Sequence, residues 1–166
     1  MPSKKVILLE QFLPIRESLA SVGKKIVFTN GCFDLIHRGH IDYLRLSKNL
    51  GDILVVGLNS DRSVRRIKGP GRPITPEEDR AEILAALDFV DYIILFDEDT
   101  PFELIKAIVP DILAKGADWS ENEIVGAEIV KAAGGEVARI PLTPGKSTSG
   151  LIGKILDTFG REKIGE

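Results

Sequence analysis

The chain has 166 residues, which is enough for one domain with a substantial core but too few for two. Its formal net charge of −3 lacks the basic excess that tracks a nucleic-acid backbone, so we expect no nucleic-acid partner. Cys32 is the only cysteine, which excludes an intrachain disulfide, and the apolar runs are too short for a membrane span or a secretory signal. We expect one cytoplasmic domain over residues 1–166.

The predicted elements begin with an extra helix and continue as alternating strands and helices. Within residues 6–22, the apolar residues Leu9, Phe12, Leu13 and Leu19 are spaced for one face of an N-terminal helix. Short runs rich in valine, isoleucine and leucine then mark five strands, at residues 26–29, 53–58, 92–96, 112–115 and 137–140. Such strands, separated by helical segments, are typical of a parallel sheet covered on both faces. The predicted fold class is α/β, with a doubly wound five-stranded parallel sheet.

Two helix starts are marked by a threonine followed by proline and glutamate. In Thr75–Glu78 and Thr100–Glu103, threonine is the expected N-cap, proline takes the first helical position and glutamate completes a capping box. Glycines mark two ends, Gly51 after the first core helix and Gly134 before the last strand. Arg80 lies inside one of these helices, where we expect only an ion pair along the helix.

The loop after the first strand, Asn30–His40, holds both histidines of the protein. Ligands of doubly wound sheets bind where such loops follow the carboxyl ends of strands. His37 and His40 are three residues apart, so in the first turn of a helix both rings face one side, beside free backbone N–H groups. Gly39 lets a phosphate approach the backbone closely. The pattern predicts a phosphate-binding site, whereas Cys32 has no visible base beside it and is expected to pack.

A second loop, rich in glycine and proline, follows the second strand and its short helix. Lys68 opens this loop and Arg72 follows, and both cations can reach a phosphate. The alternative is that Arg65, Arg66 and Lys68 form a solvated basic face.

Two more segments follow strand ends. Ser147, Thr148 and Ser149 precede the last helix, where hydroxyls can cap the helix or bind the outer phosphates of a nucleotide. Lys146 comes directly before them. Lys115–Trp119 closes the fourth strand in a similar way, and we expect it near the nucleotide, with its tryptophan packed against the protein.

The string His37-Arg38-Gly39-His40 resembles the His-x-Gly-His motif of the cytidylyltransferase-like nucleotidyltransferases. Residues 29–40, Gly57–Asp61 and Lys68–Ile74 together are similar to one branch, the adenylyltransferases that form ADP-heptose from heptose 1-phosphate, alone or as the second half of a bifunctional protein. The resemblance runs from about residue 24 to residue 156 and includes no kinase half. It implies a Rossmann-like nucleotidyltransferase fold.

The resemblance also implies roles for individual residues. Those with catalytic roles are His37, His40 and Lys68. Those expected to bind the nucleotide are Thr29, Asn30, Gly31, Phe33, Gly39, His40, Lys115, Asp118, Ser147, Thr148 and Ser149. Those expected to bind the sugar phosphate are Asp34, Asn59, Asp61, Lys68 and Arg72. Lys154 stands where the family carries an arginine, which leaves open which cation contacts the outer phosphates.

The implied reaction joins AMP from ATP to a sugar 1-phosphate, with D-glycero-β-D-manno-heptose 1-phosphate as the expected acceptor and pyrophosphate as the leaving group. Such catalysis depends on holding two anions in line and stabilising the charge that develops. Mg²⁺ is expected on the phosphates of ATP, without a metal site built by the protein. A homodimer is the assembly to test.

Three alternatives stay open. Glycerol-3-phosphate cytidylyltransferases and FAD synthetases share the histidine motif, although the segments Asn59–Asp61 and Lys68–Ile74 favour the heptose branch. Outside the enzymes, an ATP-binding sensor module uses the same phosphate site without turnover.

Overall fold

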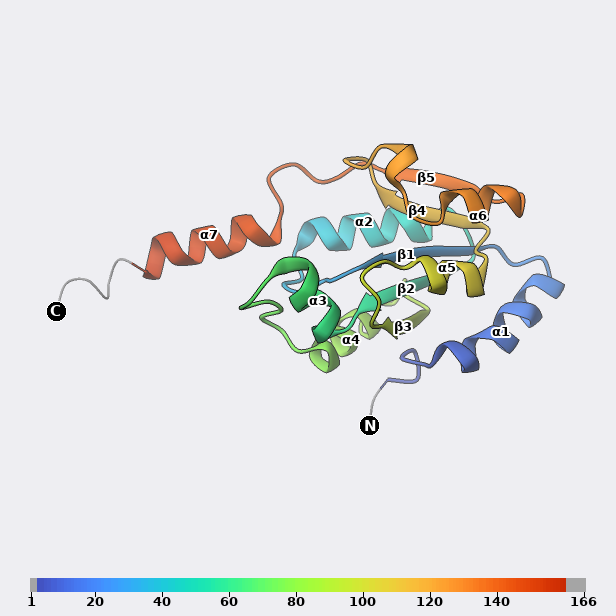
Figure 1. Ribbon diagram of the computed structural model, residues 1–166, viewed down its shortest axis with the longest axis horizontal. Coiled ribbons are helices and arrows are strands. Elements are labelled where there is room, and N and C mark those ends of the chain that lie inside the picture. The colour runs from blue at the N-terminus through green and yellow to red at the C-terminus, as the bar shows by residue number, and fades with distance from the viewer. Residues whose placement is uncertain (1–2, 161–166) are drawn as a thin grey trace.

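The computed structural model describes residues 3–160, apart from the side chain of Glu121, and is built on a five-stranded parallel sheet (Figure 1). The strands are β1 (Ile26–Gly31), β2 (Ile53–Asn59), β3 (Tyr92–Phe96), β4 (Ile112–Gly116) and β5 (Glu136–Ile140). Their order across the sheet is β3-β2-β1-β4-β5. The central strands are buried on both faces, which is why they read as continuous apolar runs and not as alternating patterns. The predicted fold class is confirmed.

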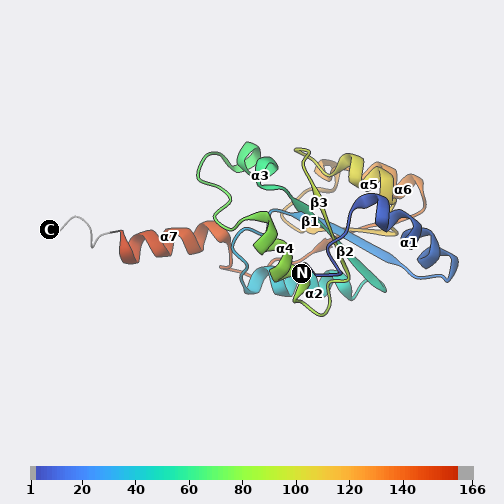
Figure 2. The same cartoon turned by 90° about the horizontal axis from the view of Figure 1, so that it is seen from below.

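Helices cover both faces of the sheet (Figures 1 and 2). One face is covered by α1 (Leu9–Ser21), α5 (Phe102–Ile108) and α6 (Ala127–Ala132), and the other by α2 (Arg38–Lys48) and α4 (Glu77–Ala85). A short helix, α3 (Asp61–Lys68), follows β2, a 3-10 turn (Glu121–Glu123) follows β4, and α7 (Thr148–Phe159) ends the described chain. Within residues 3–160, no helix is long and apolar enough to cross a membrane.

The order of the strands fixes the place of the ligand crevice. From β1 the chain first builds outward through β2 to β3, then returns to place β4 on the other side of β1. The loops that leave the carboxyl ends of β1 and β4 therefore diverge to opposite faces and leave a crevice between them. The loop with both histidines leaves β1 at this point.

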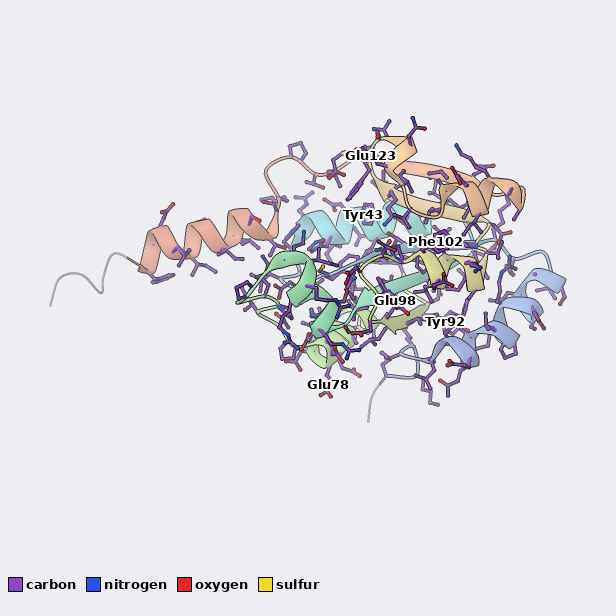
Figure 3. All side chains as sticks on the ribbon, in the orientation of Figure 1. Tyr43, Glu78, Tyr92, Glu98, Phe102 and Glu123 are labelled. Atoms are coloured by element: carbon purple, nitrogen blue, oxygen red, sulfur yellow. The ribbon has the colours of Figure 1, made fainter. Side chains whose placement is uncertain are left out.

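The predicted N-terminal helix exists but is shorter than residues 6–22. It begins at Leu9, because Val6 lies beside Ile93 in an isolated parallel bridge. Phe12 is fully buried, and its ring centroid lies 5.2 Å from that of Tyr92, which Figure 3 labels. The helix therefore packs on the core of its own chain.

The predicted threonine caps are wrong. α4 begins at Glu77 and α5 at Phe102, with Pro76 and Pro101 as N-caps, and neither cap has a side-chain hydrogen bond. Thr75 is held elsewhere, since its backbone N–H donates to Asp34 Oδ1 at 2.9 Å. This contact holds Thr75 in the preceding loop.

α7 projects away from the sheet in both views (Figures 1 and 2). It has no fully buried residue, and Leu156 and Phe159 are more than 60% exposed, at 62% and 64%. Ser147 is its N-cap and accepts a hydrogen bond from the Gly150 N–H at 3.0 Å. The expected capping by a hydroxyl is confirmed at this serine.

Candidate active site

The two histidines form a stacked pair at the start of α2. His37 is the N-cap and the backbone N–H of His40 donates to the His37 carbonyl at 2.9 Å, so both rings belong to the first turn. Their ring centroids lie 3.9 Å apart with an interplanar angle of 20°. Both Nδ1 atoms are buried without a hydrogen-bond partner among the described residues. The prediction that both rings face one side is confirmed.

Both imidazoles are held neutral at pH 7. Burial lowers the pKa of His40 to about 4, and the neighbouring His37 adds to the shift while the backbone of Leu35 opposes it. Burial also lowers the pKa of His37, with a further contribution from the charge of Lys146. A neutral imidazole has one N–H donor and one acceptor nitrogen, so each ring can donate to a phosphate oxygen or accept a proton.

Gly39 makes this packing possible. A Cβ at this position would lie 3.0 Å from Nδ1 and Cε1 of His37 and 3.0 Å from the Cβ of Lys146. Lys146 belongs to the loop before α7, which Thr143 ties to α2 through a 2.9 Å hydrogen bond to Asp42. The loop therefore brings a cation, and the Ser147–Ser149 segment after it, to the histidine end of α2. The contact of Gly39 and of these hydroxyls with a nucleotide stays a prediction.

Lys115 and Asp118 border the same crevice from the β4 side. The Lys115 ammonium group donates to Asn30 Oδ1, so a bond joins the ends of β4 and β1. Burial lowers the pKa of Lys115 to about 8, which leaves most of the population charged at neutral pH. A Cβ on Gly116 would clash with Oδ1 of Asp118, so glycine leaves room for this carboxylate. Trp119 is 51% exposed, so the expectation that it packs against the protein is wrong.

Thr29 lies beneath the crevice and not on its surface. It is fully buried, and its hydroxyl lies 2.7 Å from the Tyr43 hydroxyl, which donates to the Ala114 carbonyl at 3.1 Å. The expected contact of Thr29 with the nucleotide is therefore corrected to a support that joins β1, α2 and β4. Phe33 has a similar place: it is 5% exposed, with its ring edge-on to His40 at 5.2 Å, and it closes over Gly31.

Asp34 and Arg72, both expected at the sugar phosphate, form an ion pair. Arg72 Nε donates to Asp34 Oδ2 at 2.5 Å, while Asp34 Oδ1 accepts the backbone N–H groups of Ile74 at 2.8 Å and Thr75 at 2.9 Å. Burial alone would raise the pKa of Asp34, but these hydrogen bonds outweigh it and lower the pKa. The Arg72 side chain is 20% exposed at the rim, and Lys68 is exposed at the end of α3.

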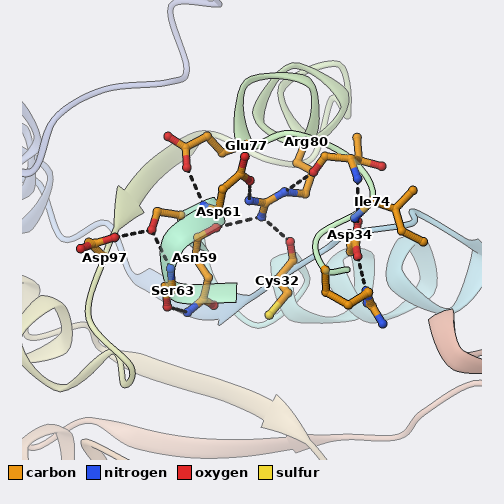
Figure 4. A network of polar contacts seen from close by, with 12 residues as sticks. Cys32, Asp34, Asn59, Asp61, Ser63, Ile74, Glu77, Arg80 and Asp97 are labelled. Carbon is orange, nitrogen blue, oxygen red and sulfur yellow. Dashed lines mark hydrogen bonds and ion pairs between the residues drawn. The ribbon is translucent and has the colours of Figure 1, made fainter. Parts of the chain in front are cut away.

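The other two residues expected at the sugar phosphate, Asn59 and Asp61, have partners inside the protein (Figure 4). Asn59 is 3% exposed and its amide donates to the Ser63 hydroxyl at 3.0 Å, so it supports α3 and does not face a ligand. Asp61 accepts a hydrogen bond from Arg80 at 2.7 Å.

Arg80 is the residue that the sequence interpretation missed. It is fully buried, contrary to the expectation of an ion pair along its own helix. The signal was its spacing: Arg80 lies four residues before Leu84, on the apolar face of α4.

Within the described residues, no three metal-ligating side chains lie close enough to hold an ion. The site combines a stacked, partly buried pair of neutral imidazoles with nearby cations from β4, from the loop before α7 and from the end of α3 with the loop after it, and with backbone N–H groups at the start of α2.

The chain is similar to members of a known protein family. The model of the family described as cytidylyltransferase-like matches residues 28–148. The chain is 54% identical over 151 residues to the bifunctional protein HldE of Methylobacillus flagellatus, covering 91% of this chain and 31% of that protein. It is 58% identical over 139 residues to HldE of Citrifermentans bemidjiense, covering 84% of this chain and 28% of that protein. The chain thus spans about a third of the length of the curated relatives it matches.

Two solved structures are also similar. The lipopolysaccharide core biosynthesis protein of Thermoplasma volcanium GSS1 is 33% identical with a TM-score of 0.58, over 73% of this chain and 98% of that one. Pantoate-beta-alanine ligase of Francisella tularensis has a TM-score of 0.61 at 18% identity, over 87% of this chain and 68% of that one, and shares the fold alone. The resemblance inferred from the motif His37–His40 is confirmed, and the chain belongs to the cytidylyltransferase-like family.

Proposed function

We propose that this protein is a nucleotidyltransferase that joins AMP from ATP to a sugar 1-phosphate, D-glycero-β-D-manno-heptose 1-phosphate, and releases pyrophosphate. The observation that carries the proposal is the stacked pair of neutral histidines at the start of α2, beside the crevice between β1 and β4. More than 50% identity to two HldE proteins over most of this chain supports the heptose branch.

The reaction balances without a covalent enzyme intermediate. An oxygen of the acceptor phosphate forms a bond to the α-phosphorus of ATP, while the bond from that phosphorus to the α,β-bridging oxygen breaks. The bonding electrons leave with pyrophosphate. Negative charge develops on the α-phosphate oxygens and on the leaving group, so fixed donors at those positions lower the barrier.

Different residues of the site stabilise different parts of the two substrates. His37 and His40 donate N–H groups to the phosphate chain from the first turn of α2, where burial keeps both rings neutral. Lys146 and Lys115 supply positive charge from the loop before α7 and from β4. Lys68, at the end of α3, and Arg72, in the loop after it, face the acceptor phosphate. Mg²⁺ belongs in this proposal to the ATP complex, where phosphate and water oxygens are its preferred ligands.

The test is a pyrophosphate-release assay with ATP, CTP, GTP and UTP against heptose 1-phosphate, glycerol 3-phosphate and other sugar phosphates, with the nucleotide product identified by mass. We expect ADP-heptose, and at least about 100-fold higher kcat/KM for ATP than for CTP, because unmatched polar groups at the base edge are costly. CDP-glycerol as the main product would overturn the heptose assignment. ATP binding without pyrophosphate release would identify a sensor module.

Two further expectations remain proposals. One is a cytoplasmic location. The other is a homodimer, which light scattering on the purified chain measures directly.

A further inference from the structure

Among the buried side chains that the structure describes, the one that makes the most hydrogen bonds lies outside the histidine pair. Arg80 is fully buried on α4 and donates four hydrogen bonds (Figure 4). Its acceptors are the Thr75 carbonyl at 2.9 Å, the Cys32 carbonyl at 2.6 Å, the Asn59 carbonyl at 2.8 Å and Asp61 Oδ1 at 2.7 Å. A guanidinium has five N–H groups in one plane, so this set nearly exhausts it.

These acceptors come from three separate segments of the site. Cys32 lies in the turn after β1, two residues before Asp34. Asn59 and Asp61 lie at the junction of β2 and α3. Thr75 ends the loop that carries Arg72. One side chain thus fixes the positions of three segments relative to one another.

The loop of residues 69–75 needs contacts of this kind to hold it in one conformation. Gly69 and Gly71 have positive φ angles of 90° and 86°, and a Cβ on either would meet nothing within 4 Å. The far end of the loop is held from two sides, by Arg80 at the Thr75 carbonyl and by Asp34 at the N–H groups of residues 74 and 75. Because Arg80 also binds the carbonyl of Cys32, it sets the turn from which Asp34 reaches the loop.

We propose that Arg80 is a positioning residue for the acceptor: it holds the Arg72 loop and the turn after β1 in the arrangement that receives the sugar phosphate. The inference rests on the proposed function, because it deepens the acceptor side of the same site. Arg80 touches no substrate. It acts by preorganising Arg72, whose guanidinium would otherwise have to be ordered at the cost of binding energy.

The test is Arg80→Lys in the full chain, with Arg66→Lys as the matched control. Lysine keeps a charge for Asp61 but cannot reach three carbonyls from one plane. Arg66 also pairs with an aspartate, Asp99 at 2.6 Å, but on the exposed side of α3. For Arg80→Lys we expect the KM of the sugar phosphate to rise at least about 10-fold while the KM of ATP changes by less than about 2-fold. Arg66→Lys should leave both values unchanged.

A second measurement needs no turnover. Hydrogen–deuterium exchange of the peptide covering residues 69–76 should speed up in Arg80→Lys and stay unchanged in Arg66→Lys. If circular dichroism shows that Arg80→Lys is unfolded, Arg80→Gln replaces it, since glutamine brings no charge into the buried site.

The outcomes separate the two proposals. A wild-type chain without pyrophosphate release overturns the proposed function, while the exchange experiment still tests the anchoring of the loop. In an active enzyme, a lower active fraction with both KM values unchanged would mean that Arg80 is only structural. An equal rise in the KM of ATP, or unchanged exchange in the loop, would also overturn the inference.

Discussion

The protonation states of single residues in this site depend more on their surroundings than on the residue type. His37 and His40 lie at a helix N-terminus, where a cationic ring is unfavourable, and burial keeps both rings neutral. Neutral rings can stack at 3.9 Å without repulsion. The bound phosphates of a nucleotide would raise the pKa of both imidazoles, because an anion nearby favours the protonated form.

At this scale we predict that His37→Ala or His40→Ala lowers kcat about 100- to 1000-fold, as loss of one transition-state donor does. The dissociation constant of ATP should change much less, because the donors matter most when charge develops on the phosphates. Steady-state kinetics and calorimetric ATP titration measure the two quantities. A variant with wild-type turnover would remove the histidines from the mechanism.

We also predict that ATP binding takes up protons through His40. The pKa of free His40 is about 4, so the ring is neutral in the unbound protein above that pH. A phosphate beside it raises the pKa, and the uptake should therefore grow as the pH falls from about 8 to about 5.5. Calorimetry in two buffers of different ionisation enthalpy counts the protons. His40→Gln should lose the His40 share, and an identical proton count in this variant would contradict the assignment.

At the scale of an element, α2 can hold the two histidine rings in their stacked position only because the residue between them is a glycine. Gly39→Ala places a Cβ 3.0 Å from the His37 ring, which is itself held by its stacking on His40. We predict a loss of kcat of about 10-fold or more from this displacement, with the far-UV circular dichroism unchanged.

Gly153→Ala in α7 is the matched control for this change, because a Cβ there meets nothing within 4 Å. It should keep full activity and gain helix stability of about 1 kcal/mol. Full activity in Gly39→Ala would show that the close packing at this turn is not needed.

The elements also show where sequence reasoning succeeds and where it does not. The strands and the position of the histidine pair were predictable, because apolar runs and a spacing of three residues are local patterns. The start of α4 was not, because Asp34, about 40 residues away in the chain, binds the backbone of Thr75. The burial of Thr29 and the role of Arg80 were missed for the same reason: their partners come from distant segments. Asn30 and Lys115 were expected near the nucleotide, but the bond between them depends on the strand order.

At the scale of the whole molecule, the buried titratable groups make stability depend on pH. The pKa of His40 is lowered to about 4 on folding, so the unfolded chain binds its proton more readily. The stability from this group is complete above the unfolded pKa of about 6.5 and is lost as the pH falls toward about 4. Asp34, whose pKa is also lowered, adds a loss that begins as the pH falls through the ordinary carboxyl pKa of about 4 and continues below it.

We therefore predict that the free energy of unfolding falls by about 1 to 2 kcal/mol between about pH 7 and pH 4.5, after allowance for the part of the His40 ring that solvent reaches. Denaturant unfolding at a series of pH values measures the slope. His40→Gln should flatten the slope in this window, because glutamine takes up no proton in the unfolded state, and it should leave the steeper loss below about pH 4, which belongs to Asp34 and other carboxylates. A slope in the variant equal to that of the wild type would show that another group titrates, and would remove the burial of His40 as its cause.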